Sequence, residues 1–262
     1  MCEVSTIVTT GGRPDDHSRL LAQTAAEKLH YPMIERHKRS VAQLQQQYES
    51  DVLVAGKNRY ELYRIGMKEP FFFHPNSAAF RLKRLLNGES DPMIEACGLR
   101  TGDTFLDCTL GLASDSILAS FTVGTGGKVL GIEGDPDVAF ITATGLKTFP
   151  AKFEELVGAM DRIEVIQSEA IDFLRQQPEA AWDVVYIDPM FHQPIEESSN
   201  FTPLRTVGMD QRLTAEWVEQ ALRVCKRRIV VKDRFDSPAF DLFKLERTIR
   251  PTSKFHYGRL SK

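Results

Sequence analysis

The chain has 262 residues, of which 42% are hydrophobic and 26% charged, and its formal net charge is −3. These values are ordinary for a globular protein and exclude a wholly disordered chain, a collagen-like chain and a globally basic nucleic-acid coat, although not a local basic face. The longest apolar runs, such as residues 184–187, are far short of the ~20 residues that a membrane-spanning helix needs. The N-terminus lacks the basic start and long apolar stretch of a signal peptide. We therefore expect a cytoplasmic protein with no membrane partner.

The first part of the chain predicts a small α/β module over residues 1–70. A β-branched run at 4–10 predicts a strand, and apolar residues at helical spacing around 20–29 predict a helix that Asp15 or Asp16 would cap. Further elements are expected as a helix within residues 35–48 and strands at 51–55 and 60–65.

An aromatic run at residues 71–73 and a predicted basic helix follow this module. The segment from Ser77 to Leu86 has helical spacing and carries Arg81, Lys83 and Arg84. Two interpretations remain open: a linker helix with a solvated charged face, or a basic wall that faces nucleic acid. Turn signals at 87–102 then separate this part from the rest.

From residue 102 onward, short apolar runs alternate with helical stretches. The expected strands cover residues 104–108, 128–133, 163–166, 183–187 and 228–232, and the expected helices cover 115–121, 136–146, 169–176 and 213–224. This alternation predicts a parallel sheet with helices on both faces, and hence an α/β domain over residues 71–262. Ligands of such sheets bind beyond the carboxyl ends of the strands, so the strand ends are where functional residues are expected.

The first strand ends in a turn with a single glycine between two carboxylates. Gly111 stands alone, without the G-x-G-x-x-G pattern or a Walker lysine, which argues against a dinucleotide or an ATP phosphate. Asp107 and Asp115 would repel a pyrophosphate but suit a cation, such as the sulfonium and ammonium of S-adenosylmethionine (SAM). Alternatively, Asp115 is only a favourable anion in a first helical turn.

Acidic residues also follow the next two strands. Glu133 is expected to accept hydrogen bonds from ribose hydroxyls, while Asp135 caps a helix that begins with Pro136. Glu169 could reach an adenine amino group, although a role at the start of a helix accounts for it equally well.

The fourth strand runs directly into Asp188-Pro189-Met190-Phe191. Proline fixes φ and lacks an amide donor, so a carboxylate, an outward backbone carbonyl and an aromatic ring meet at the ligand edge. This set suits an exocyclic amine on a flat base, whose hydrogens Asp188 and the carbonyl accept while Phe191 stacks on the ring. The alternative is a simple Asp-Pro turn that ends the strand.

These motifs resemble those of class I SAM-dependent methyltransferases. The stretch from Asp107 to Asp115 resembles their first motif, and Asp-Pro-Met-Phe resembles the D/N-P-P-Y/F motif of enzymes that methylate exocyclic amines. Together with Val230-Val231-Lys232 and Phe255-His256-Tyr257, it resembles more narrowly the RsmJ family, the bacterial 16S ribosomal RNA guanine-N2 methyltransferases. The resemblance covers roughly residues 74–260.

The sequence departs from that family at two places. His192 follows the motif where the family usually has proline. The turn reads Gly111-Leu112-Ala113-Ser114-Asp115 where the family usually has G-L-G-R-D.

The resemblance implies a Rossmann-like sheet, mostly parallel with an antiparallel last strand, that binds SAM and methylates a nucleobase amine. The implied cofactor-binding residues are Asp107, Thr109, Gly111, Ser114, Asp115, Glu133, Gly134, Glu169 and Asp188. The implied catalytic residues are Asp188, Pro189 and Phe191, and the implied substrate contacts are His192, Arg205, Lys232 and His256.

The expected substrate is guanine N2 in ribosomal RNA, so RNA or the small ribosomal subunit is the expected partner. Basic clusters such as Lys226-Arg227-Arg228 agree with this. Two alternatives remain: a methyltransferase acting on a small molecule or a protein amine, and a non-enzymatic RNA-binding or ribosome-assembly protein with this fold. None of the four cysteines forms a C-x-x-C pair, so we expect no metal.

Overall fold

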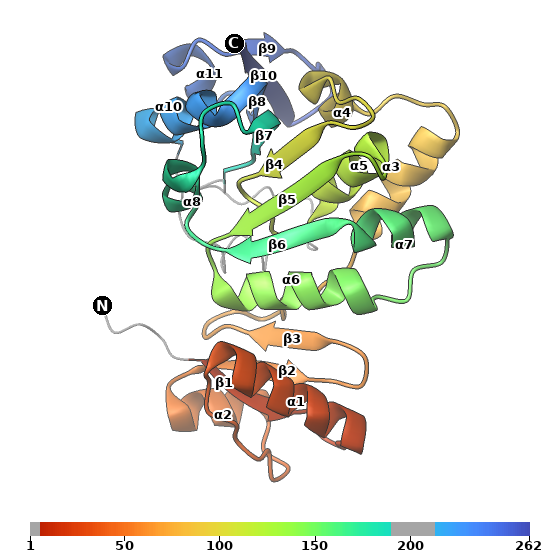
Figure 1. Cartoon of the computed structure of the whole chain (residues 1–262). Coiled ribbons are helices and arrows are strands. Elements are labelled where there is room, and N and C mark those ends of the chain that lie inside the picture. Colours follow the sequence, from red (N-terminus) through yellow and green to blue (C-terminus); the bar gives the residue numbers. More distant parts are fainter. Residues whose placement is uncertain (1–5, 190–212) are drawn as a thin grey trace.

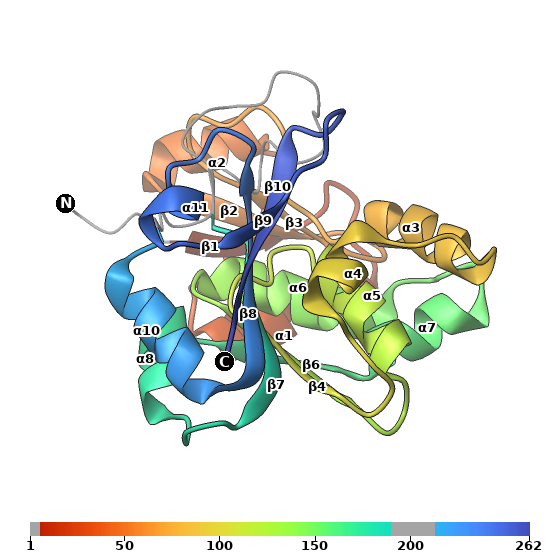
Figure 2. The ribbon, with the colours of Figure 1, turned by 90° about the horizontal axis from the view of Figure 1, so that it is seen from above.

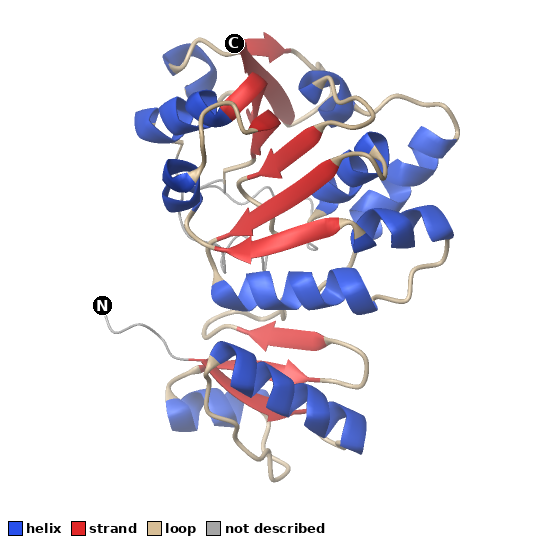
Figure 3. Cartoon of the chain, viewed as in Figure 1, coloured by secondary structure: helices blue, strands red, loops and turns tan. Residues whose placement is uncertain are grey.

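The computed structural model describes residues 6–189 and 213–262, which form two β-sheets flanked by helices (Figures 1 and 3). The smaller sheet consists of β1 (Thr6–Thr10), β2 (Asp51–Ala55) and β3 (Tyr60–Tyr63). The larger sheet consists of β4 (Thr104–Asp107), β5 (Lys128–Glu133), β6 (Ile163–Gln167), β7 (Trp182–Ile187), β8 (Cys225–Arg234), β9 (Glu246–Thr248) and β10 (Phe255–Ser261). No described helix has the length and apolar character needed to cross a bilayer.

Ten described helices accompany the sheets. They are α1 (Asp16–Leu29), α2 (Val41–Tyr48), α3 (Asn76–Leu86), α4 (Pro92–Cys97), α5 (Ser114–Val123), α6 (Pro136–Thr148), α7 (Glu154–Asp161), α8 (Ala170–Gln176), α10 (Ala215–Val224) and α11 (Ala239–Leu242). Three of them, α4, α7 and α11, were not predicted. Asp91 caps α4 by accepting the amides of Met93 and Ile94, Pro92 opens the helix, and Gly98 ends it with a left-handed φ of 55°.

The large sheet has the strand order β6-β5-β4-β7-β8-β10-β9. The strands from β6 to β8 are parallel, and β10 runs antiparallel to β8. The predicted mostly parallel sheet with an antiparallel last strand is therefore confirmed. Because the strand order reverses between β4 and β7, the carboxyl ends of these two strands flank the position where ligands of open α/β sheets bind.

Alternate residues of the buried strands face two different layers of helices. Val184 and Tyr186 of β7 belong to the hydrophobic cluster that includes residues of helices α3 to α7, whereas Val185 and Ile187 belong to the cluster that includes residues of α8, α10 and α11. Figure 2 shows these helix layers from above. A strand buried on both faces needs an apolar side chain at every position, which is why the sequence showed continuous apolar runs here.

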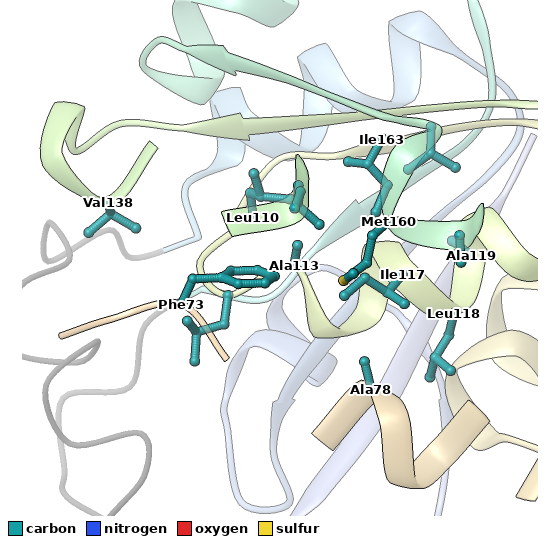
Figure 4. Packing of buried hydrophobic residues seen from close by; sticks show 14 of the residues in the cluster. Phe73, Ala78, Leu110, Ala113, Ile117, Leu118, Ala119, Val138, Met160 and Ile163 are labelled. Atoms are coloured by element: carbon teal, nitrogen blue, oxygen red, sulfur yellow. The ribbon is translucent and has the colours of Figure 1, made fainter. Parts of the chain in front are cut away.

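The small sheet lies against α6 of the larger unit (Figure 1). In it β1 and β2 are parallel and β3 is antiparallel to β2, and Asp15 caps α1 as one of the two predicted candidates. Its core is continuous with that of the larger unit, because Leu62 and Phe73 share a single cluster with Ile141 of α6. Figure 4 shows Phe73 of the connecting segment in the same cluster as Ala113 of the larger unit. The division at residue 70 remains a prediction.

Candidate active site

The turn after β4 brings the glycine motif to the carboxyl edge of the sheet. Gly111 and Ala113 both have left-handed φ values, 51° and 58°. This conformation costs an alanine roughly 1–2 kcal/mol, which is a physical reason for the glycine that the resembled family usually has at the position of Ala113. Ala113 gives α5 no side-chain cap, and the half-buried Ser114 is the first residue of that helix.

Asp107 is buried, and its carboxylate shapes this turn. One oxygen accepts the Thr109 amide at 3.0 Å and the Thr109 hydroxyl at 3.3 Å, and the other accepts the Ser116 hydroxyl at 2.6 Å. Burial raises the pKa of Asp107 to about 7. Thr109 Oγ1 also accepts the backbone amide of Asp188 at 2.7 Å, which ties the turn after β4 to the end of β7.

Glu133 lies at the end of β5, next to the same turn. Its Oε2 accepts the Gly111 amide and its Oε1 accepts the Asp135 amide, both at 3.0 Å. Burial raises the pKa of Glu133 to about 7. Each carboxylate oxygen has a second lone pair, so this side chain can still accept two hydroxyl donors, as a ribose diol offers. Asp135 caps α6 through the amides of Asp137 and Val138, so this cap prediction is confirmed.

The other residues predicted at this end of the sheet lie beside Glu133. The half-buried Gly134 directly follows it, and the carbonyl of Gly134 accepts the side-chain amide of Gln167 at 3.0 Å. Glu169 stands just before α8, and burial raises its pKa. The neighbouring strands β5 and β6 therefore bring both predicted acids to one edge.

A largely buried network of charged groups lies at the ends of β7 and β8. Asp188 Oδ2 accepts Lys232 Nζ at 2.6 Å, and the same ammonium lies 3.2 Å from Asp115 Oδ2. The Tyr186 hydroxyl donates to that oxygen of Asp115 at 2.8 Å, and Arg81 Nη1 donates to the other at 2.5 Å.

Arg81 extends this network to α4. Its guanidinium also forms two parallel hydrogen bonds, of 2.9 and 2.8 Å, with the carboxylate of Asp91. The network thus holds three carboxylates and two cations, a formal charge of −1. We call these five side chains, Arg81, Asp91, Asp115, Asp188 and Lys232, the charge network.

The charge network contains one unsatisfied acceptor. Asp188 Oδ1 is buried and has no hydrogen-bond partner among the residues that the structure describes. Burial and the neighbouring Asp115 raise the pKa of Asp188 despite Lys232. The carboxylates of Asp115 and Asp188 raise the pKa of Lys232 well above its ordinary value, although burial opposes this. An unpaired buried acceptor in a network of net negative charge suits a ligand that brings N–H donors and positive charge.

The structure brings most of the predicted residues together, with exceptions. Pro189 is buried directly after Asp188, whereas Phe191, His192 and Arg205 lie outside the described residues. His256 lies on the side of the sheet away from Lys232, because Tyr257 is the register partner of Lys232 and neighbouring residues of a strand point to opposite faces. There it is buried near Phe235 and Phe240, with Nε2 3.2 Å from the Arg250 carbonyl.

Asp115 was expected to face the cationic groups of SAM, but both of its carboxylate oxygens already have hydrogen-bond partners within the chain. A direct contact between Asp115 and the cofactor stays a prediction. Sequence reasoning missed Arg81, Asp91 and Tyr186 as parts of this site. Among the residues that the structure covers, no group of three potential ligand side chains is arranged to hold a metal ion.

Comparisons with known proteins agree with this geometry. Residues 32–249 match a family described as "Putative SAM-dependent methyltransferase". The chain is 45% identical over 253 residues to the uncharacterized protein YpiP of Bacillus subtilis, a match that covers 96% of this chain and 98% of YpiP. It is 31% identical over 211 residues to Ribosomal RNA small subunit methyltransferase J of Vibrio parahaemolyticus, which covers 72% of this chain and 78% of that protein.

A solved structure shows the same fold. The crystal structure of a SAM-dependent methyltransferase of Neisseria gonorrhoeae superposes with a TM-score of 0.59 at 17% sequence identity, and the match covers 97% of this chain and 95% of that one. The strand order, the carboxylates at the ends of β4, β5 and β7, and these matches lead to one conclusion: the chain belongs to the SAM-dependent methyltransferase family.

Proposed function

We propose that this protein transfers a methyl group from SAM to an exocyclic amine of a nucleobase in RNA, and that guanine N2 in ribosomal RNA is the substrate. The single observation that carries the proposal is the buried, unpartnered Oδ1 of Asp188 at the carboxyl end of β7. The similarity to ribosomal RNA methyltransferase J supports RNA as the substrate class. A ribosomal substrate would place the protein in the cytoplasm.

The cofactor would occupy the edge formed by the ends of β4, β5 and β6. Glu133 would accept the ribose hydroxyls with its remaining lone pairs, and the backbone at Gly111 and Ser114 would approach the methionine part. Glu169 would reach the adenine amino group. When bound, SAM supplies an electrophilic methyl group on a sulfonium.

Asp188 and Pro189 would act on the accepting nitrogen. The lone pair of an amino-purine nitrogen is delocalised into the ring, so the site must favour the pyramidal form of that nitrogen. Oδ1 of Asp188 would accept one amine hydrogen and the carbonyl of Pro189 the other, while Phe191 stacks on the base. Holding the nitrogen about 3 Å from the methyl carbon would supply much of the rate acceleration.

The net negative charge of the site would favour the positive charge that develops on the accepting nitrogen. Positive charge would develop on the amine nitrogen as its bond to the methyl carbon forms and the bond from that carbon to sulfur breaks, with S-adenosylhomocysteine as the leaving group. The charge network holds three carboxylates against two cations. Preorganised negative charge stabilises such a transition state. The methylated nitrogen is acidic, so its proton can leave afterwards and no strong base is needed before transfer.

Titration calorimetry with SAM tests the cofactor site. Wild type should bind SAM, and Glu133→Ala should weaken binding at least tenfold, which corresponds to about 1.4 kcal/mol. Asp172→Ala is the matched control, because it removes an exposed carboxylate at the edge of α8 and should leave binding unchanged. A folded wild type that does not bind SAM would contradict the proposal.

Methyl transfer from labelled SAM then tests the substrate. Ribosomal RNA, small ribosomal subunits, protein extracts and small amines are offered in parallel to wild type and to Asp188→Ala. The proposal predicts RNase-sensitive incorporation by wild type only. Labelling of protein or of small amines alone would favour the alternative methyltransferase, and SAM binding without transfer to any substrate would also contradict the RNA proposal.

A further inference from the structure

Lys232 is the member of the charge network that touches the proposed catalytic carboxylate. It extends from β8, the strand next to β7, and its Nζ contacts Oδ2 of Asp188 and Oδ2 of Asp115. Its ammonium also lies 5.7 Å from the ring centroid of Phe255. The side chain is only 21% exposed, so these contacts are largely shielded from water.

We infer that Lys232 is a positioning residue for methyl transfer, which fixes Oδ2 of Asp188 so that Oδ1 faces the substrate amine. This inference rests on the proposed function. The two oxygens of a carboxylate are equivalent until a neighbour distinguishes them. Lys232 binds one at 2.6 Å, and the other stays buried without a partner among the described side chains. The ion pair therefore decides which acceptor the substrate meets.

The rest of the charge network holds Lys232 in place. Asp115 accepts Lys232 Nζ, and Asp115 is itself fixed by the Tyr186 hydroxyl on one oxygen and by Arg81 on the other. Arg81 is clamped by Asp91 through two hydrogen bonds. A chain of contacts thus runs from α3 to Oδ2 of Asp188, and such support keeps a catalytic group within about 0.5 Å of its working position.

The surroundings argue against Lys232 as a general base. The carboxylates of Asp115 and Asp188 raise its pKa well above the ordinary value, so the side chain remains an ammonium at neutral pH and cannot accept the amine proton. As a cation, its second effect is to keep Asp188 ionised. A protonated Asp188 would offer the substrate a hydroxyl donor instead of an acceptor.

Removal of Lys232 would leave Asp188 among groups that oppose its ionisation. The groups that interact electrostatically with it are Lys232 and Asp233 of β8, Asp115 of α5, Asp107 of β4 and Tyr186 of β7. Lys232 is the cation among these five. Lys232→Met therefore leaves a buried carboxyl beside other carboxyl groups, and the acid limb of the pH–rate profile should move to higher pH.

The test compares Lys232→Met and Lys232→Arg with Lys226→Met. Lys226 lies on the same strand, is 44% exposed and pairs with Asp183 at 3.5 Å. Its replacement should leave the SAM affinity, kcat and the pH–rate profile unchanged. For Lys232→Met we expect SAM affinity within about threefold of wild type, kcat at neutral pH reduced at least a hundredfold, and an acid limb raised by one pH unit or more. Lys232→Arg should restore part of kcat, and thermal unfolding of each variant confirms that it is folded.

Three outcomes separate the possibilities. If Lys232→Met transfers methyl groups with the kcat and pH profile of wild type, Lys232 positions nothing and the inference is wrong. If kcat falls but the acid limb stays where it is, and Lys232→Arg rescues nothing, Lys232 contributes only to folding of the site and the inference is again wrong. If wild type itself does not methylate RNA, the failure belongs to the proposed function instead.

Discussion

Replacement of Arg81 by methionine should destabilise the protein far more than the same change three residues further along α3. The Arg81 side chain is 20% exposed and bonds both Asp91 and Asp115, whose side chains are 7% and 9% exposed. Arg81→Met leaves both of these carboxylates buried with fewer partners. Removing one member of a buried ion pair costs about 3–5 kcal/mol, because the remaining charge is uncompensated.

Arg84→Met is the matched control. Arg84 pairs with Glu89, and these two side chains are 49% and 48% exposed. Exposed pairs contribute roughly 0–1 kcal/mol, since water and salt screen them. Urea unfolding of both variants gives the two changes in unfolding free energy. A change for Arg81→Met within about 1 kcal/mol of that for Arg84→Met would show that Arg81 does not hold the two buried carboxylates.

The loss of unfolding free energy in Arg81→Met should also depend on pH. Although burial opposes it, Lys232 and Arg81 together lower the pKa of Asp115 below its ordinary value of 3.8. A carboxyl with a lowered folded-state pKa stabilises the fold above its unfolded-state pKa, and this contribution disappears as the pH falls through the folded-state value. The deficit of Arg81→Met should therefore be full above about pH 4 and shrink below it. A deficit that grows on acidification would contradict this assignment.

Three further outcomes follow from the structure. Burial raises the pKa of Glu133 to about 7, so the protonated side chain is favoured in the folded state. The unfolding free energy of wild type relative to Glu133→Gln should therefore fall by up to about 3 kcal/mol as the pH rises from 4.5 to 7. A difference that does not change with pH in urea titrations would contradict this. Gly145→Ala should destabilise the protein by about 1–3 kcal/mol, because the added Cβ would lie 2.2 Å from the Phe73 side chain. In Gly158→Ala the added Cβ meets only the flexible end of an arginine at 3.3 Å, so this variant should be stabilised by about 0.5–1 kcal/mol. Equal melting temperatures of the two variants would contradict this contrast. Thr109→Val removes the hydroxyl that accepts the backbone amide of Asp188, so kcat should fall about tenfold. The hydroxyl is already bonded within the chain, so SAM affinity should change little in calorimetry. A loss confined to SAM affinity would instead support the cofactor contact that the resemblance implies for Thr109.

The five strands β4 to β8 of the larger sheet could be predicted because they are apolar runs between helical stretches, whereas no ranges were predicted for β9 and β10, which follow the last of these runs. The short helices were harder. The pattern of Leu156, Ala159 and Met160 in α7 was a usable signal, since these three residues are buried at helical spacing. In α4, turn-forming residues flank only six helical ones, so the capping signature of Asp91-Pro92 was read as part of a turn.

The strand-end rule located Glu133 and Asp188, because the position of a residue directly after a buried strand is fixed by the fold. It could not locate Arg81, which comes from a helix outside the alternating pattern and looked like part of a charged face. It also could not place His256, because the register between β8 and β10 decides which face that residue occupies. Contacts created by tertiary packing between distant segments are not encoded in local spacing.

The role of Asp188 is tested most directly by mass spectrometry of nucleosides from ribosomal RNA incubated with SAM and either wild type or Asp188→Ala. We expect N2-methylguanosine with wild type and none with the variant, while both proteins bind SAM. Methylation that survives in Asp188→Ala, or that falls on an atom other than an exocyclic amine, would contradict the role given to the unpartnered oxygen of Asp188.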